Sequence, residues 1–227
     1  MIIAVHQPQY MPWLGYFDKI AAADHFVLLD TVQFKKNEWQ NRNQIKTAQG
    51  KQWFTVPVTY HFPEKIHQVR INNAVGWQEN QQKSLQANYA KAPFFNNSLG
   101  FLDRVFADSW ETISELNCFV VKELVRALGI STPIYIASEL GDFPDSPDER
   151  LIGITKHFCG TIYLAGSGGR QYMDLDKFRR AGIEVLFQEY HHPVYPQLFG
   201  DFEPYMSVLD LLFNCGPASL NILRGNE

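Results

Sequence analysis

Cysteine is scarce in this sequence. Cys118, Cys159 and Cys215 are the only three in 227 residues, and they are widely spaced without a CxxC pair. This pattern supports neither a disulfide framework nor a cysteine-rich zinc site. We therefore expect a reducing, cytoplasmic location and assign no metal ligand. Cys118 lies in an apolar helical stripe, where a small buried side chain is the expected role.

Basic charge and long apolar runs are lacking as well. Twenty Lys and Arg stand against 24 Asp and Glu, which gives a formal net charge of -4 and a pI near 6.0. Binding to phosphate backbones needs a basic surplus, so nucleic acid is not the expected partner. No apolar stretch is long enough to cross a bilayer, and we expect no integral membrane segment. The sequence does not fix the oligomeric state.

What the chain does contain is enough apolar residue to fill a large core. Hydrophobic residues make up 45% of the sequence and charged residues 19%, a balance that argues against disorder. We expect a single domain over residues 1–227. Its middle, residues 77–128, has apolar residues at helical spacing and is expected to be a helical insertion or subdomain.

The first thirty-odd residues predict a β-loop-α-β unit. Ile2 to Val5 form an apolar β-branched run, helical spacing follows from Leu14, and Phe26 to Leu29 form a second apolar run. Strands joined by such a crossover are almost always parallel, and ligands collect at their carboxyl ends. His6, Gln7 and Asp30 are predicted to lie at those ends.

The last hundred residues repeat this alternation. Strands are predicted over residues 133–137, 161–165 and 183–187, with helices starting at Ser146 and at Asp174. The predicted fold is therefore α/β, a mostly parallel sheet built from βαβ units with a nucleotidyltransferase or Rossmann-like core and a largely helical middle segment. A terminal helix is expected over residues 202–216.

The segment from Asp30 to Val58 combines amides, basic residues and an aromatic side chain. Lys36, Arg42 and Asn43 surround Trp39, which suits an anion-binding or sugar-binding surface. Arg42 is the strongest candidate, because a guanidinium binds phosphate or carboxylate through two donors. The alternative is a solvated loop or irregular helix whose charges face water.

A glycine-rich loop follows the strand over residues 161–165. Its candidates for ligand contact are Gly168, Gly169, Arg170 and Tyr172, since glycines let backbone amides approach a ligand. The loop is neither GxGxxG nor a P-loop, and a plain turn is an equal alternative. Further on, adjacent His191 and His192 point to opposite sides of an extended chain, so a shared metal is not expected.

Four blocks of the sequence are informative together. They are HQPQYMPWLGYFDKI (6–20), DTVQFKKNEWQNRNQIK with WFTVPV (30–46 and 53–58), IYLAGSGGRQYMD (162–174) and FGDFEPYMSVLDLLFNCG (199–216). In these blocks the chain resembles the WbqC-like protein family, which is met in O-antigen and other surface-polysaccharide gene clusters and some members of which have been suggested to be glycine transferases. The resemblance implies a transferase role but supplies no catalytic residue.

A more distant likeness concerns the N-terminal unit alone. Its strand, His-Pro loop and helix resemble the opening of adenylate-forming nucleotidyltransferases such as pantothenate synthetase, which carry an HxGH motif there. This chain departs from the motif because no second histidine follows Gly15. The likeness implies a nucleotide-binding-like core rather than nucleotidyl chemistry.

These observations lead to a hypothesis and its alternatives. His6 is the expected general base for acyl or aminoacyl transfer to an amino sugar, oriented by Asp30; the alternative is a structural histidine that fixes the loop before Pro8. The substrate is expected to be a small molecule, a nucleotide-activated sugar or acyl donor, and no cofactor is assigned. A nucleotidyltransferase-like enzyme and a noncatalytic binding protein are the competing functions. The predicted binding residues are Gln7, Tyr10, Trp13, Lys36, Trp39, Arg42, Asn43, Gly168, Gly169, Arg170 and Tyr172.

Overall fold

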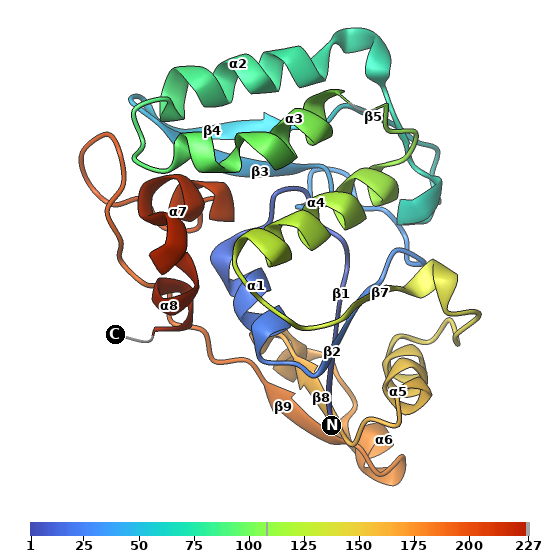
Figure 1. Ribbon diagram of the computed structural model, residues 1–227. Coiled ribbons are helices and arrows are strands. Elements are labelled where there is room, and N and C mark those ends of the chain that lie inside the picture. The colour runs from blue at the N-terminus through green and yellow to red at the C-terminus, as the bar shows by residue number, and fades with distance from the viewer. Residues whose placement is uncertain (108, 226–227) are drawn as a thin grey trace.

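The fold is α/β, as the sequence predicts. A computed structural model describes residues 1–107 and 109–225 (Figure 1). Its centre is a five-stranded parallel sheet with the strand order β7-β2-β1-β8-β9. The strands are β1 (Ile2–His6), β2 (His25–Leu28), β7 (Ile134–Ile136), β8 (Ile162–Ala165) and β9 (Glu184–Phe187).

The strand order reverses at β1. The chain first adds β2 and β7 on one side of β1, then returns to add β8 and β9 on its other side. In open parallel sheets such a reversal leaves a crevice at the carboxyl ends of the two strands that flank it. Here those strands are β1 and β8.

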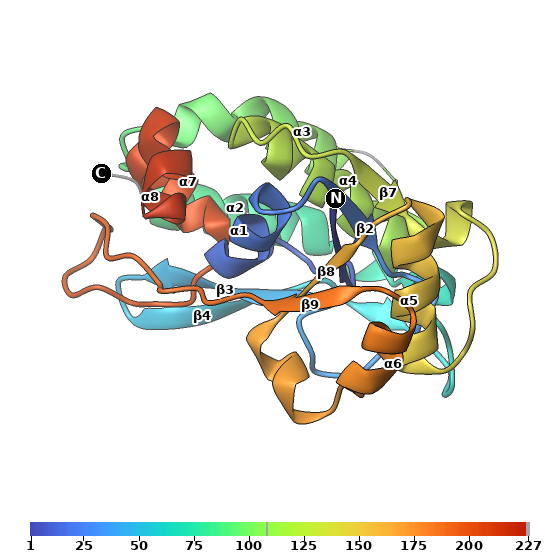
Figure 2. The same ribbon diagram turned by 90° about the horizontal axis from the view of Figure 1, so that it is seen from below.

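Helices cover both faces of this sheet (Figures 1 and 2). Helix α1 (Leu14–Ala21) lies on one face, together with α4 (Ile113–Ala127), while α5 (Pro147–His157) and α6 (Leu175–Arg180) cover the other. Ala4 and Leu164 point to the α1 face, whereas Ile3, Val5 and Tyr163 point to the α5 face. Burial on both faces explains why these strands read as continuous apolar runs.

The segment between β2 and β7 adds a second layer of structure. Strands β3 (Arg42–Thr47) and β4 (Gly50–Thr55) form an antiparallel hairpin. The sequence alternatives for β3 included a loop or irregular helix; the residues instead pair because Gly50, at φ +99°, closes the turn. The remaining elements are β5 (Val58–Thr59), β6 (Arg70–Ile71), α2 (Trp77–Tyr89) and α3 (Leu99–Ala107).

Two helices complete the described chain, α7 (Val208–Cys215) and α8 (Ser219–Arg224). The first begins six residues later than the sequence suggests, after a non-helical residue, Tyr205 at φ +64°. Asp210 is fully buried and accepts a hydrogen bond from the hydroxyl of Tyr89 at 2.8 Å. It therefore serves the core and does not face solvent.

One hydrophobic cluster runs from the sheet through the middle segment. It joins Phe26 and Leu28 of β2 to Leu85 of α2, Leu124 of α4 and Phe213 of α7. This continuity supports the proposal that residues 1–227 form one domain with residues 77–128 as its helical part. None of the helices in the described part of the chain is long and apolar enough to cross a membrane.

Candidate functional site at the end of the central strand

His6 ends the central strand β1 on the face that α1 covers. Its ring meets the ring of Tyr16 edge-on, with centroids 4.9 Å apart. Nδ1 lies 3.1 Å from the carbonyl oxygen of Gln7, and because a carbonyl only accepts, Nδ1 carries the proton. The Nε2 lone pair is thus left as an acceptor. The Tyr16 hydroxyl donates to the same carbonyl at 3.1 Å.

Lys19 is the charged neighbour of this histidine. The side chain is only 3% exposed, and its ammonium donates to the carbonyl oxygen of Val5 at 2.9 Å. Burial lowers the pKa of Lys19 to about 7. Burial, and then the charge of Lys19, lower the pKa of His6 to about 3. The imidazole of His6 is therefore neutral at physiological pH.

Lys19 is a residue that the sequence prediction missed. It stands in the helical segment LGYFDKIA, where five of its neighbours are buried. A lysine within such an apolar helix is ordinarily read as a surface residue, since its long stem lets the charge reach water. The signal that would have found it is the contact of α1 with the end of β1, which only the fold supplies.

Asp30 lies two residues beyond the end of β2 and is buried. Its carboxylate accepts hydrogen bonds from the hydroxyl of Ser114 at 3.0 Å, and from the hydroxyl and amide of Ser138 at 2.7 and 3.0 Å. Within the described part of the chain no hydrogen bond joins Asp30 to His6. The predicted orienting contact is therefore absent; Asp30 instead ties the end of β2 to α4 and to the turn after β7.

The loop after His6 and the amide-rich segment lie side by side. Gln40 Nε2 donates to Gln7 Oε1 at 2.7 Å, and the Tyr10 amide donates to the Trp39 carbonyl at 3.1 Å. Asn117, from α4, donates to the carbonyls of both Pro8 and Gln40. Residues predicted separately from two parts of the sequence are thus brought together.

Two predicted binding residues have no access to a ligand. Tyr10 is fully buried, stacks on Phe54 with centroids 6.0 Å apart, and donates to Gln81 Oε1 at 2.5 Å. Asn43 is also fully buried and donates to the Tyr10 carbonyl at 3.3 Å. Both were predicted to contact substrate. They belong to the core because the hairpin packs its inner face on this loop.

Three predicted residues lie on the outer side of the amide-rich segment. Lys36 and Trp39 are exposed, and Trp39 stands next to Trp53 of β4. The guanidinium of Arg42 lies 4.1 Å from the centre of the Trp53 ring, and its Nη2 donates to the carbonyl of Asn37. Trp53 was not among the predicted binding residues.

Trp13 belongs to a different aromatic cluster. Its ring covers the first turn of α1, where a Cβ at Gly15 would lie 2.3 Å from it. The ring stacks on His192, with an interplanar angle of 14°, and also contacts Tyr190 and Tyr205. His192 is partly buried, which lowers its pKa. His191, its neighbour in the sequence, is exposed.

The glycine-rich loop follows β8, the neighbour of β1. The last residues that pair between these strands are Ala4 and Leu164, and β8 ends at Ala165. Gly168 is exposed, and a Cβ at Gly169 would come within 2.8 Å of the Met173 sulfur. Close packing thus explains Gly169 without a ligand. Tyr172 is exposed.

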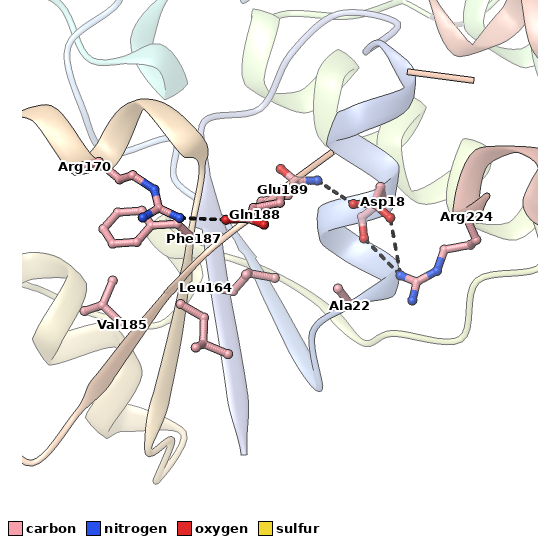
Figure 3. A pocket seen from close by; sticks show the side chains of 10 residues that line it. Asp18, Ala22, Leu164, Arg170, Val185, Phe187, Gln188, Glu189 and Arg224 are labelled. Atoms are coloured by element: carbon pink, nitrogen blue, oxygen red, sulfur yellow. Dashed lines mark hydrogen bonds and ion pairs between the residues drawn. The ribbon is translucent and has the colours of Figure 1, made fainter. Parts of the chain in front are cut away.

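Arg170 leaves this loop toward a surface cavity of about 560 Å³ (Figure 3). Its guanidinium forms an ion pair with Glu189 at 3.0 Å and lies over the Phe187 ring. On the other side of the cavity, Asp18 forms an ion pair with Arg224 and accepts a hydrogen bond from the side chain of Gln188. Leu164 and Leu186 contribute apolar surface. Of these lining residues, the sequence predicted only Arg170.

The described side chains gather no group of three or more His, Cys, Asp or Glu that could hold a metal ion. The sheet order, with its reversal next to a neutral histidine, places the chain in the broad class of doubly wound α/β proteins.

Comparison with known proteins identifies the family. Residues 7–222 match the WbqC-like protein family, and the chain belongs to it. The Uncharacterized protein Rv1507c of Mycobacterium tuberculosis (strain ATCC 25618 / H37Rv) is 36% identical over 226 residues, which cover 98% of this chain and 97% of that relative. No solved structure matches the chain.

Proposed function

We propose that this protein is a cytoplasmic transferase of surface-polysaccharide biosynthesis, which passes an acyl group, such as glycyl, to an amino sugar. The observation that carries the proposal is the neutral, oriented imidazole of His6 at the carboxyl end of the central strand. Its proton is fixed on Nδ1 by Gln7, so Nε2 is free to accept another. Family membership supports the same proposal.

The proposed step is direct transfer from an activated donor. The amine of the sugar attacks the acyl carbonyl carbon, the bond to the leaving group breaks, and Nε2 of His6 takes the proton that the amine nitrogen loses. Attack makes this nitrogen positively charged and more acidic than it was in the free amine, which favours transfer of its proton to a positioned base. The leaving group departs with the bonding electron pair.

Substrate contacts in this proposal come from the surface around His6. We assign these contacts to Gln7, which follows His6, to the backbone of Gly168, and to Lys36, Trp39 and Arg42 of the segment that Gln40 joins to Gln7. The donor is an activated acyl compound, and its phosphate, or that of a nucleotide-activated sugar that serves as acceptor, contacts Lys36 or Arg42. Asp30 acts as a positioning residue, through its hydrogen bonds to α4 and to the turn after β7.

The test is a thermal-shift panel of nucleotides, nucleotide-sugars and acyl donors, followed by mass spectrometry of the product with any donor that binds. Ligands that bind only the folded state raise its melting temperature. We expect His6→Gln to keep the shift but lose transfer about 100-fold or more. His61→Gln, which alters an exposed histidine, is the matched control. Equal transfer by wild type and His6→Gln would overturn the proposal.

A nucleotidyltransferase-like activity is the second candidate, and the strand order favours it. Sheets that reverse next to their first strand commonly bind nucleotides at the reversal. Such an enzyme would release pyrophosphate from ATP or CTP when its second substrate is added. Pyrophosphate release that depends on His6 would support this candidate over acyl transfer.

A further inference from the structure

Two tryptophans are exposed next to each other, Trp39 in the segment before β3 and Trp53 on β4. Trp39 is 39% exposed and Trp53 44%, and their ring centroids lie 5.7 Å apart with an angle of 39° between the planes. Single exposed apolar residues are common on protein surfaces. Two exposed tryptophans in contact with each other are uncommon on protein surfaces, and such a pair indicates a binding surface.

The hairpin register explains why Trp53 faces outward. Trp53 pairs with Gln44, and the adjacent pair, residues 43 and 54, is buried. Side chains alternate along a strand, so Trp53 projects on the opposite side from Phe54. Phe54 packs in the core, and Trp53 does not. Core packing therefore does not account for the tryptophan at this position.

The segment around the two rings carries both amides and charged side chains, with Lys36 and Glu38 exposed next to Trp39. Asn37, Asn41 and Gln44 lie on the same segment or hairpin, and the Arg42 guanidinium covers the Trp53 ring at 4.1 Å. Amides provide both donors and acceptors, which matches hydroxyl groups.

We infer that Trp39 and Trp53 form a stacking platform for the sugar rings of a carbohydrate chain. Aromatic faces contact the apolar face of a sugar ring while the amides bond its hydroxyls. A nucleic-acid strand would also stack, but it needs a basic surplus that this chain of net charge -4 lacks. This inference rests on the proposed function and names its acceptor as an oligosaccharide.

The platform is connected to the end of the central strand. Trp39 precedes Gln40, whose side chain donates to Gln7, and Gln7 follows His6. In the inferred complex, a chain of two or more sugar rings stacked on the tryptophans would extend along this connection toward the imidazole. In this arrangement the platform determines which acceptor binds, and His6 determines whether it reacts.

Calorimetric titration with chitotetraose and with its fully de-N-acetylated form tests this inference. We expect binding by the wild type and a loss of about tenfold or more in Trp53→Ala and Trp39→Ala. Trp53→Phe, which keeps an aromatic face, should recover part of the affinity. Phe62→Ala, which removes an exposed aromatic side chain elsewhere, is the control and should bind as the wild type does.

Several outcomes would overturn the platform. These are no binding of either tetrasaccharide by the wild type, unchanged binding by both Ala variants, or Trp53-dependent binding of a ten-residue oligothymidylate in place of the saccharides. The His6→Gln variant separates the two proposals, because it should bind saccharide normally. Trp53-dependent binding without any acyl transfer would contradict the proposed function but support the platform. Acyl transfer with the same KM for acceptor in the wild type and in both Ala variants would support the proposed function but contradict the platform.

Discussion

The side chain of Gln40 donates a hydrogen bond to the side chain of Gln7 at 2.7 Å, and joins two loops that are 33 residues apart in sequence. One loop begins at His6, and the other carries Trp39 and Arg42. Gln40 is itself buried and accepts from the amide of Lys35 at 2.8 Å. This contact makes the two loops parts of one surface.

Loss of this contact should loosen the surface. Gln40→Leu leaves Gln7 Oε1 and the Lys35 amide without their partner, and we expect a destabilisation of about 1–3 kcal/mol together with a higher KM for acceptor. Urea denaturation measures the first effect and steady-state kinetics the second. Gln82→Leu, at an exposed position on α2, is the control. A Gln40→Leu variant as stable as that control would contradict the prediction.

The neutral state of His6 predicts how stability changes in acid. The folded protein binds a proton at His6 only near pH 3, while the unfolded chain binds it near pH 6.5. Between these values the unfolded state holds more protons, so stability falls with decreasing pH by up to about 1.4 kcal/mol per pH unit from this group. His6→Gln should flatten this part of the profile in urea unfolding followed from pH 7 to pH 4. An unchanged slope would show that His6 titrates normally in the fold.

Lys19 predicts a change on the alkaline side. Its pKa in the folded protein is about 7, against 10.5 in the unfolded chain, so the unfolded state binds more protons between those values. Stability should therefore rise as pH increases from 7 to 10. Lys19→Met should abolish this rise and also raise the pKa of His6, since the positive charge is gone. Lys83→Met, at an exposed site on α2, should leave the profile as it is.

Asp30 distinguishes positioning from catalysis. Asp30→Asn replaces one accepting oxygen by an NH2 group facing donors on Ser114 or Ser138, and we expect a loss of about 2–4 kcal/mol. Differential scanning calorimetry measures it. If Asp30 acts only by positioning, Ser138→Ala should reduce transfer in the same sense and to a smaller degree. A large loss of kcat in Asp30→Asn at unchanged stability would instead make Asp30 a catalytic residue.

The cysteines should differ in their reactivity. Cys118 is buried, and burial raises the pKa of its thiol to about 12, whereas Cys159 is exposed. Because the thiolate is the reactive form, iodoacetamide at pH 8 should label Cys159 first and Cys118 only on unfolding. Mass spectrometry of the labelled peptides gives the order, with Cys159→Ser as the control. Early labelling of Cys118 would contradict its place in the core.

The fold could be predicted because local patterns and strand geometry agree. Apolar runs before His6 and before Asp30 gave β1 and β2, and the Ser146-Pro147 start gave α5. The hairpin was harder to predict from the sequence, because β3 contains Arg42, Asn43 and Gln44, which have low strand propensity. Pairing with β4 and a buried inner face override that local preference.

The sequence predicted which residue types lie in the region of the candidate site, but not which of their side chains face the solvent and which face the core. Residue type alone marked Tyr10 and Trp39 as equal candidates, yet one is buried against Phe54 and the other is exposed. Trp53 and Lys19 were missed because their roles depend on which face of a strand or helix meets its neighbour. Orientation of that kind depends on tertiary packing, which no local pattern encodes.

The pairing of β1 with β8 joins residues 160 positions apart, such as Ile2 with Ile162. During synthesis the central strand is made well before β8, one of its two neighbours, which follows some 160 residues later. Until then β1 has one open edge, which is a site for mispairing with other chains. Contacts of such high sequence separation slow folding, and this late pairing of β1 with β8 also assembles the crevice beside His6.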